Sequence, residues 1–235
     1  MKRECMLVHP AGLVPYGAAN EAMHDLAHRR AGDETPDVLV LLEHPPTYTA
    51  GRRSDPAHVL WTEDRIRAAG AELHHIDRGG SLTFHGPGQL VGYPILKLGS
   101  RLEVIEHLRR MEEIVIRAGA DIGVGLGRDP KQTGVWAGDK KVAAIGVRLT
   151  AGRVTLHGFG LNCSTDLSWF DAIVPCGLAD RGVTSLSELA GRTITTEEIA
   201  PLVEHHFEDT FGRTLEPAPA SLATSSHAAR RSAAV

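Results

Sequence analysis

Cysteine is scarce in this chain, and aromatic residues make up only 5% of it. The three cysteines, Cys5, Cys163 and Cys176, are an odd number at unrelated spacings, so we expect neither a disulfide framework nor a zinc cluster. Histidine is plentiful, but adjacent residues such as His74 and His75 point to opposite sides of a strand and cannot present two ligands together. The sequence therefore predicts that the protein has no metal site. It leaves open whether one of the cysteines has a catalytic thiol.

Long apolar runs and basic blocks are also missing. No run approaches the roughly 18 to 20 apolar residues needed to cross a bilayer, and the N-terminus lacks the apolar core of a signal peptide. Lys and Arg number 25 against 29 Asp and Glu, which gives a net charge of -4. These absences argue against a nucleic-acid partner and against a membrane location. We expect a cytoplasmic, globular protein whose 235 residues, 42% of them hydrophobic, can fill a real core.

The hydrophobic pattern predicts helices and strands that alternate without strict βα periodicity. Strands are expected at residues 5–8, 37–44, 72–77, 89–96, 133–137, 141–149 and 153–162. Helices are expected at residues 15–30, 63–69, 102–118 and after Thr195, whose pairing with Glu198 resembles a capping box. Residues 47–54 and 78–88 are expected to be loops. This order favours an α/β or α+β domain with a mixed β-sheet flanked by helices.

The C-terminal end of the chain has a different composition from the rest. From residue 216 onward it consists mainly of Ala, Ser and Pro, without any aromatic residue. Such a segment cannot bury enough apolar surface to order itself. We therefore expect one domain over residues 1–213 and a disordered, dispensable tail over residues 214–235.

A glycine-rich segment at residues 78–88 interrupts what would otherwise be a strand. Glycine permits positive φ and lets a ligand or another chain segment approach the backbone closely. The segment therefore reads as a loop that lines a site, with the strand at residues 89–96 fixing its far end. A decorated turn between two strands would give the same pattern.

Cys176 is the cysteine whose surroundings best suit chemistry. Pro175 fixes φ before it and Gly177 frees the backbone after it, so the pattern predicts a thiol on a tight, exposed turn. Neighbouring N–H groups could then serve as an oxyanion hole. The alternative is a small apolar filler at a turn, and Cys5 and Cys163, within apolar strands, fit that description better.

A nucleophilic cysteine needs a cation or a base beside it, and Lys141 is a candidate. Strand alternation puts Lys141 on the same face as Ala143 and Ile145, where burial would lower its pKa. Lys140 has the opposite parity and is expected in solvent. An ordinary surface lysine at the start of a strand is the alternative for Lys141.

Several separated segments resemble the lipoyl (octanoyl) transferase family, whose relatives are the lipoate and biotin protein ligases. They are RGGSLTFHGPGQLVGYPIL from Arg78, GDKKVAAIGVRL from Gly138, HGFGLNCSTDLSWFDAIVPCGLADRGVTSLSEL from His157 and, less diagnostically, LLEHPPTYTAGRR from Leu41. The resemblance runs from about Leu13 to Leu189. It implies a fold like that of the biotin and lipoate protein ligases.

The resemblance also implies an activity and its partners. An enzyme of this family moves an octanoyl (or lipoyl) group, delivered on the phosphopantetheine of acyl-carrier protein, to a lysine of a lipoyl domain. Acceptors would be the lipoyl domains of 2-oxoacid dehydrogenase complexes and the glycine cleavage H protein. By this resemblance Cys176 forms an acyl-thioester intermediate and Lys141 tunes it, without ATP and without a metal.

The resemblance assigns the acyl site to three segments of the chain. The residues are Arg78, Gly79, Gly80, Ser81, Leu82, Thr83, Phe84, His85, Ala144, Ile145, Gly146, Gly158, Phe159 and Gly160. Phe84 stands where the family often has tyrosine, which removes a hydroxyl and keeps a ring. We expect the glycines to leave room for the acyl tail, whereas Arg78 and His85 have an alternative role as braces that bond backbone carbonyls.

Two other functions stay open at this point. An ATP-dependent lipoate or biotin protein ligase would share the fold, activate a free acid as an adenylate and need no nucleophilic cysteine. A non-catalytic module that binds acyl-carrier protein or lipoyl domains would leave Cys176 idle.

Overall fold

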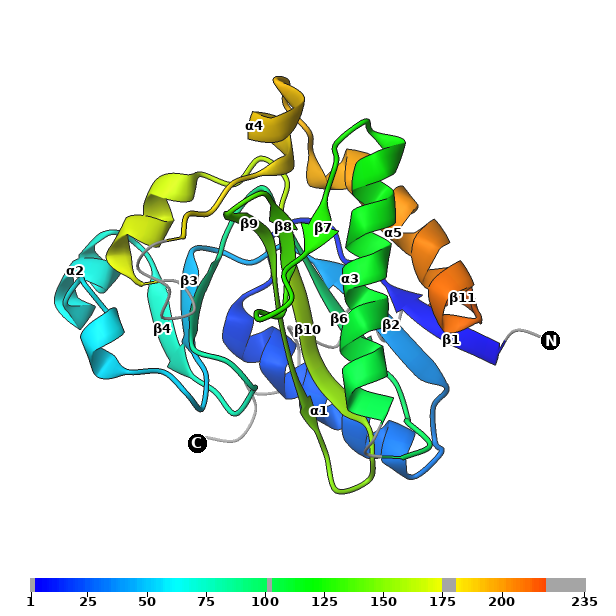
Figure 1. The fold of residues 1–235 in the computed structure, drawn as a ribbon. Coiled ribbons are helices and arrows are strands. Elements are labelled where there is room, and N and C mark those ends of the chain that lie inside the picture. Colours follow the sequence, from blue (N-terminus) through cyan, green and yellow to red (C-terminus); the bar gives the residue numbers. More distant parts are fainter. Residues whose placement is uncertain (1–2, 101–102, 175–180, 219–235) are drawn as a thin grey trace, which may run out of the picture.

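A large mixed sheet dominates the computed structural model, which describes residues 3–100, 103–174 and 181–218 (Figure 1). Its strand order is β11-β1-β2-β6-β10-β9-β8-β7. The strands are β1 (Arg3–Val8), β2 (Asp37–Leu42), β6 (Gln89–Ile95), β7 (Gly127–Arg128), β8 (Val135–Ala137), β9 (Lys140–Leu149), β10 (Thr155–Asn162) and β11 (Arg213–Pro217). β1 pairs in parallel with β2 and β11, and the remaining pairs are antiparallel. The mixed sheet expected from the sequence is confirmed.

Helices cover both faces of this sheet. α1 (Tyr16–Ala31) packs on one face, against β6 and β10, and α3 (Glu103–Asp121) and α5 (Thr196–Phe211) pack on the other. Each face has its own hydrophobic cluster, and every residue of β2 is buried between them. This is the burial that a continuous apolar run predicts. Within the described residues, none of the helices is both long and apolar enough to cross a membrane.

A smaller sheet of order β4-β3-β5 lies beside the large one. It consists of β3 (Thr47–Ala50), β4 (Glu72–His75) and β5 (Leu82–His85). Three short helices accompany it: η1 (Pro56–His58), α2 (Glu63–Ala68) and η2 (Leu167–Ala172). The expectation of loops throughout residues 47–54 and 78–88 was wrong, because both contain a strand. Tyr48 of β3 and Phe84 of β5 are buried and lie opposite each other in the paired strands. This packing joins residues far apart in the sequence, so the pattern of either short segment could not predict it.

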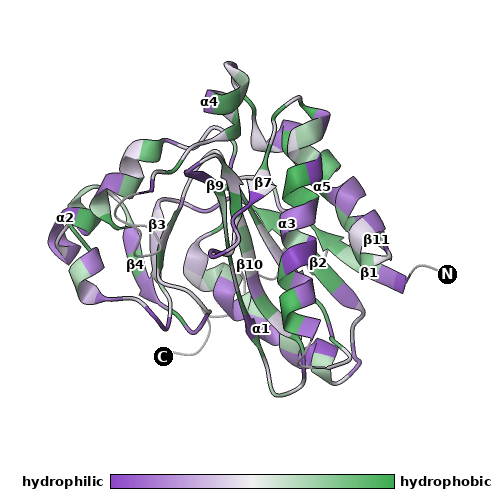
Figure 2. Cartoon of the chain, in the orientation of Figure 1, coloured by the Kyte–Doolittle hydropathy of each residue, from purple (hydrophilic) through white to green (hydrophobic). Residues whose placement is uncertain are grey.

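Helix α3 differs in two ways from the expected one. Ile105, expected on the buried face, is 70% exposed, and His107 is buried instead, one turn before Met111. Figure 2 shows the resulting alternation of hydrophobic and hydrophilic residues along α3. Gly119, expected to end the helix, lies inside it, and a side chain there would collide with Leu126 at 2.5 Å. Close packing, not chain termination, accounts for this glycine.

Helix α5 begins as the sequence predicts. The Thr195 hydroxyl accepts a hydrogen bond from the backbone N–H of Glu198 at 3.3 Å, which satisfies one of the free donors of the first turn. Pro201 lies inside the helix. Helix α4 (Leu186–Ala190), which precedes α5 in the chain, is short and capped in the same way by Ser185.

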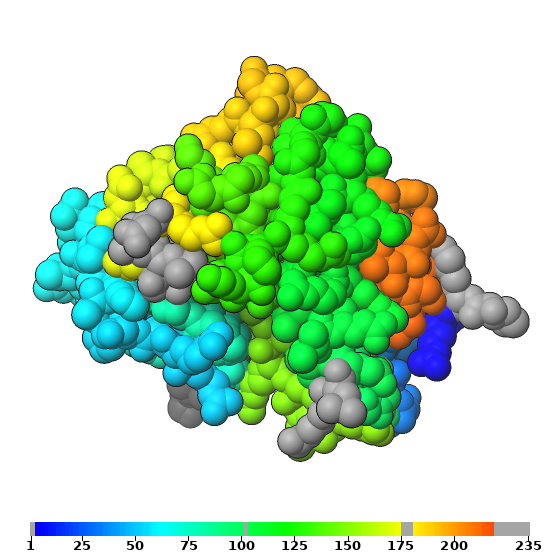
Figure 3. Space-filling view, viewed as in Figure 1, coloured from blue at the N-terminus to red at the C-terminus, as the bar shows by residue number. Residues whose placement is uncertain are grey.

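The described chain continues as a strand beyond residue 213. β11 adds residues 213–217 to the edge of the large sheet as a parallel neighbour of β1, so the expectation of disorder was wrong for residues 214–217. Residues 219–235 lie outside the described part of the chain. Figure 3 shows β11 and α5 on the same side of the molecule as β1. Arg213 holds this strand by donating two hydrogen bonds to buried Asp37, at 2.6 and 2.9 Å.

Replacing Arg213 with alanine is expected to lower the free energy of unfolding by about 2 to 3 kcal/mol, because Asp37 stays buried with one arginine fewer. Arg30, at 2.6 Å, would be its remaining ion-pair partner. Urea unfolding measures the loss. Arg192→Ala is the control, because the Arg192–Glu198 pair is exposed and worth under about 1 kcal/mol. Equal effects of the two substitutions would contradict a structural role for β11.

Candidate active site

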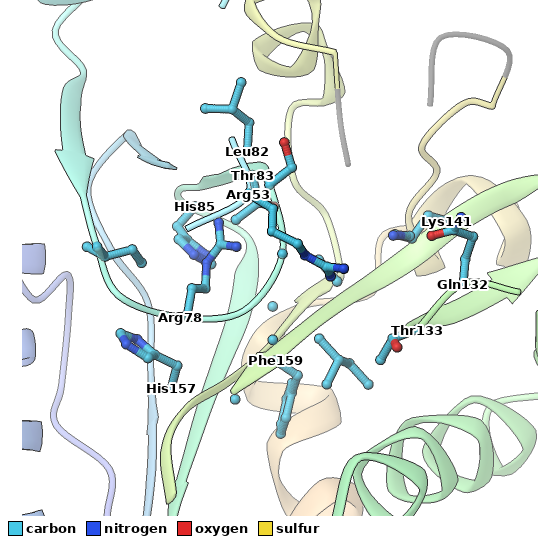
Figure 4. Close-up of a pocket in the computed structure, with 18 of the residues that line it drawn as sticks. Arg53, Arg78, Leu82, Thr83, His85, Gln132, Thr133, Lys141, His157 and Phe159 are labelled. Atoms are coloured by element: carbon cyan, nitrogen blue, oxygen red, sulfur yellow. The ribbon is translucent and has the colours of Figure 1, made fainter. Parts of the chain in front are cut away.

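A cavity of about 580 Å³ lies between the two sheets (Figure 4). The residues before and within β5 form one wall, and β9 and β10 form another. Of the described residues that the sequence assigned to the acyl site, all except Gly79 and Phe84 line this cavity. In Figure 4, Lys141, Gln132 and Thr133 stand at one end, Arg78, His85 and His157 at the other, and Phe159 between them. Segments far apart in the sequence therefore meet at one site.

Cys176 lies outside the described residues, as do its neighbours from 175 to 180. The described chain on both sides of this segment is fixed next to the cavity. Before it, the N–H of Val174 donates to the carbonyl of His58, a cavity residue, at 2.8 Å. After it, the N–H of Lys141 donates to the carbonyl of Gly182 at 3.0 Å.

Lys141 is held at the start of β9 by backbone bonds and by an aromatic ring. Its carbonyl accepts from the N–H of Thr184 at 2.9 Å, and its ammonium nitrogen lies 4.7 Å from the ring centroid of Trp136. Only 6% of Lys141 is exposed, whereas Lys140 is exposed. The burial that alternation predicted for Lys141 is thus confirmed. Lys141 thus lines the cavity while most of its surface is removed from solvent.

Arg78 is almost fully buried and binds the backbone around it. Its guanidinium donates to the carbonyl and the hydroxyl of Thr49, both at 2.9 Å, and to the carbonyl of Gly79 at 3.1 Å. These bonds tie the segment before β5 to β3. These hydrogen bonds to backbone carbonyls fit the structural role given above as the alternative for Arg78. Arg78 also lines the cavity.

A chain of side-chain hydrogen bonds runs from His85 toward Lys141. Nδ1 of His85 lies 2.7 Å from Oε1 of Gln89, and Nε2 of Gln89 donates to Oδ1 of Asn162 at 2.8 Å. Nδ2 of Asn162 then donates to the carbonyl of Thr184 at 3.0 Å, beside Lys141. The far end of the cavity is therefore connected by hydrogen bonds to the segment that holds the lysine.

The protonation state of His85 follows from its burial. Desolvation, together with nearby His44, lowers the pKa of His85 to about 3, so the ring is neutral near pH 7. Gln89 accepts with Oε1 because its amide nitrogen already donates to Phe84 and Asn162. His85 thus carries its proton on Nδ1, and Nε2 bears a lone pair.

Two tyrosines and a histidine form a buried polar group at the His85 end. The Tyr93 hydroxyl lies 2.8 Å from Nε2 of His44, and Nδ1 of His44 lies 2.6 Å from the carbonyl of Val14. The carbonyl can only accept, so His44 donates from Nδ1 and accepts from Tyr93. The Tyr16 hydroxyl is buried and has no hydrogen-bond partner among the described residues. Burial raises the pKa of Tyr16 to about 12 and is the main cause that lowers the pKa of His44 to about 4.

Two glycines of β10, Gly158 and Gly160, line the cavity and are also packed closely against neighbouring residues. A side chain at Gly158 would collide with the carbonyl oxygen of Gly92 in the neighbouring strand. One at Gly160 would come within 2.8 Å of Oε1 of Gln89 and 3.2 Å of Nδ1 of His85. These positions make room for the adjacent strand and for the His85–Gln89 hydrogen bond.

Phe84 and Gly79 lie outside the cavity wall. The Phe84 ring is fully buried and stacks on Trp169 at a centroid distance of 5.3 Å, in the core of the small sheet. Its neighbours Thr83 and His85, of opposite parity along β5, line the cavity, as does Leu82 at the start of the strand. Gly79 donates its N–H to the carbonyl of Val147 at 3.1 Å, which fixes the segment against β9.

The sequence did not identify several residues that line the cavity. Tyr16, Tyr93 and His157 contribute to the His85 end, and Arg53, His58, Lys131, Gln132 and Thr133 contribute elsewhere. Burial lowers the pKa of His157 to about 3. Only one feature of the sequence could have indicated Tyr93. It alternates with Val91 and Ile95 along β6, which places its ring on a buried face and makes it a buried polar residue. Among the described residues no cluster of histidine, cysteine and acidic side chains could hold a metal ion.

Comparison with known proteins identifies the family. Residues 16–208 match the lipoyl protein ligase A/B catalytic domain. The chain belongs to this family. An octanoyltransferase from Rubrobacter xylanophilus is 48% identical over 202 residues, which cover 86% of this chain and 91% of that protein.

Solved structures of this family share the fold. Lipoate-protein ligase A bound with ATP matches with a TM-score of 0.71 at 17% identity, over 95% of this chain and 93% of that one. A chain from the Thermoplasma acidophilum structure of a bi-partite lipoate protein ligase and its E2 lipoyl domain gives 0.67 at 17% identity, over 95% and 91%. The expected ligase-like fold is confirmed.

Proposed function

We propose that this enzyme transfers an octanoyl group in two steps, through an acyl thioester on Cys176. The protein is an octanoyltransferase of protein lipoylation, as its family and its 48% identity to a curated octanoyltransferase indicate. Its acceptors belong to the lipoyl-domain proteins in general. The proposal concerns the chemistry of the transfer and the identity of the donor and acceptors.

The observation that carries the proposal is the buried Lys141 at one end of a cavity whose wall includes apolar residues. Ile76, Leu82, Ile145 and Phe159 are among these residues. Burying about seven methylenes of an octanoyl chain there would contribute about 5 to 6 kcal/mol, at roughly 0.8 kcal/mol each. The acyl group would thus be held with its reactive end near the amine.

The first step would form the thioester. Lys141 accepts the proton of Cys176, and the thiolate attacks the thioester carbonyl of the donor. Backbone N–H groups next to Gly177 are the proposed donors to the oxyanion. The sulfur of phosphopantetheine leaves as a thiolate when the new thioester forms, and it takes the proton back from Lys141, which is neutral again.

The second step would transfer the acyl group to an amine. The neutral amine of an acceptor lysine attacks the acyl-enzyme, and Lys141 again accepts a proton. As the amide forms, the C–S bond breaks and Lys141 returns this proton to the departing Cys176 thiolate. Ping-pong kinetics are expected from this sequence. We propose octanoyl-acyl-carrier protein as the donor, and the lipoyl domains of 2-oxoacid dehydrogenase complexes and the glycine cleavage H protein as acceptors, in the cytoplasm.

The reaction as proposed needs neither nucleotide nor metal, because conversion of a thioester to an amide is downhill. The alternative is a ligase that activates a free acid with ATP. To separate them, the purified protein is given an acceptor lipoyl domain with either octanoyl-carrier or octanoic acid plus ATP. Octanoylated domain formed from the carrier alone supports the transferase mechanism. Product formed from octanoic acid and ATP without any carrier contradicts it.

Lys141→Ala is expected to lower kcat/KM for octanoyl transfer by at least about a hundredfold, because general acid–base groups typically contribute 10² to 10⁴. The neighbouring Lys140→Ala is the matched control, since Lys140 is exposed and should change the rate less than about twofold. Steady-state transfer from octanoyl-carrier to a lipoyl domain measures both. Similar rates for the two variants would remove Lys141 from the mechanism.

A further inference from the structure

Tyr93 stands between two cavities. It lines the candidate active site, and it also lines a second cavity of about 300 Å³ beneath α1. It is the one residue that the two linings share among the described residues. The second cavity has a largely apolar wall, which includes Ala19, Met23, Leu26, Val40 and Leu42.

The Tyr93 side chain is fixed in this position. β6 is paired on both sides, Tyr93 itself lies opposite Val40 of β2, and only 5% of the residue is exposed. Its hydroxyl is bonded to His44, which is bonded in turn to the backbone at Val14. A ring held at its base by the sheet and at its tip by a buried histidine forms a rigid partition.

The partition lies at the end of the active-site cavity away from Lys141. His85 and His157 are at this end in Figure 4. The His44 ring, to which Tyr93 is bonded, has its centroid 5.8 Å from that of His85. An acyl chain attached near Lys141 and extended along the cavity would reach this group of rings with its methyl end.

We propose that Tyr93 closes the acyl pocket and determines which chain lengths the enzyme accepts. This rests on the proposed function, because it takes the cavity to be the acyl site. Each methylene buried in an apolar cavity favours binding by about fourfold. An open cavity would therefore favour longer chains, whereas a rigid wall turns each methylene beyond the available length into a clash.

Removing the partition should join the two cavities. In Tyr93→Ala, the ratio of kcat/KM for a dodecanoyl-carrier to that for the octanoyl-carrier is expected to rise at least about tenfold. Tyr93→Phe keeps the ring and loses only the bond to His44, so its ratio should stay within about twofold of the unaltered enzyme. Tyr93→Leu, which retains apolar volume in the strand, serves as a second opening variant should the alanine variant fail to fold.

A filled second cavity provides the matching control. Ala22 lines that cavity and not the active site. Ala22→Leu should leave the ratio unchanged when Tyr93 is present, and it should remove most of the gain when combined with Tyr93→Ala. If Tyr93→Ala raised the ratio only by making the whole protein more flexible, adding Ala22→Leu would not lower the ratio again. Circular dichroism checks that each variant is folded.

The outcomes separate this inference from the proposed function. Absence of any octanoyl transfer from the carrier by the unaltered enzyme would refute the proposed function. If the unaltered enzyme transfers octanoyl and a folded Tyr93→Ala or Tyr93→Leu variant keeps its chain-length ratio, only the inference about Tyr93 is overturned. A ratio that rises equally in Tyr93→Phe overturns it as well.

Discussion

Replacing Cys176 with alanine is expected to reduce octanoyl transfer by at least about a thousandfold, because the thioester intermediate can no longer form. Direct attack of the acceptor lysine on the carrier thioester would be the residual route. The loss should appear in kcat, with the melting temperature unchanged. Steady-state transfer to a lipoyl domain, with thermal unfolding of the same samples, measures both.

The other two cysteines supply matched controls. Cys5 and Cys163 are fully buried, and burial is the main cause that raises the pKa of each thiol to about 12. Neither can supply a thiolate near neutral pH. Cys5→Ala and Cys163→Ala should therefore keep transfer within a few-fold of the unaltered enzyme. A thousandfold loss in either control, or full activity in Cys176→Ala, would contradict the assignment.

The folded protein is expected to lose most of its stability between pH 6.5 and 4. Burial lowers the pKa of four histidines, His44 and His107 to about 4, and His85 and His157 to about 3. In the unfolded chain their pKa is about 6.5. The unfolded state therefore binds more protons in this range, so stability is full above pH 6.5 and falls as the pH is lowered toward the folded values.

The size of this effect is comparable with the total stability of a domain. At pH 5 each buried histidine lowers the free energy of unfolding by about 2 kcal/mol, so the four together lower it by about 8 kcal/mol. Typical domains have unfolding free energies of about 5 to 15 kcal/mol. Urea unfolding at pH 7.5, 6 and 5 measures the slope. Equal midpoints at pH 7.5 and 5 would contradict the buried, neutral state of these rings.

His107 isolates one of these contributions. It lies in α3, away from the cavity, and neither ring nitrogen has a hydrogen-bond partner within the described chain. His107→Leu should reduce the pH slope by about one proton and raise stability at pH 5 by about 2 kcal/mol. His205, which is exposed, is the control, and His205→Leu should leave the slope unchanged.

Local pattern predicted the large sheet except for its edge strands β7 and β11, because the other strands bury apolar side chains regularly. The parity of β9 located Lys141 in the interior and Lys140 in solvent. β3, β5 and β11 were missed because their stability comes from partners far away in the sequence, such as Tyr48 with Phe84 and Arg213 with Asp37. Such pairings leave no periodic trace in a strand of four or five residues.

The residues of the candidate site also fall into those that the sequence predicted and those that it did not. Residues in the recognisable motifs, from Arg78 to Gly160, were found, and most of them line one cavity. Tyr16 and Tyr93 were missed because they reach the cavity from a helix and a strand whose patterns indicate core packing. Gly158 and Gly160 line the cavity as expected, but only the folded structure shows which neighbouring atoms a side chain at each position would meet.

Intact-protein mass spectrometry tests the central proposal most directly. The enzyme is incubated with octanoyl-carrier and no acceptor, then quenched in acid. We predict an adduct of about 126 Da on the unaltered enzyme and on Cys163→Ala, absent from Cys176→Ala and discharged on adding a lipoyl domain. An adduct that persists in Cys176→Ala, or transfer that proceeds without any adduct forming, would contradict the proposal.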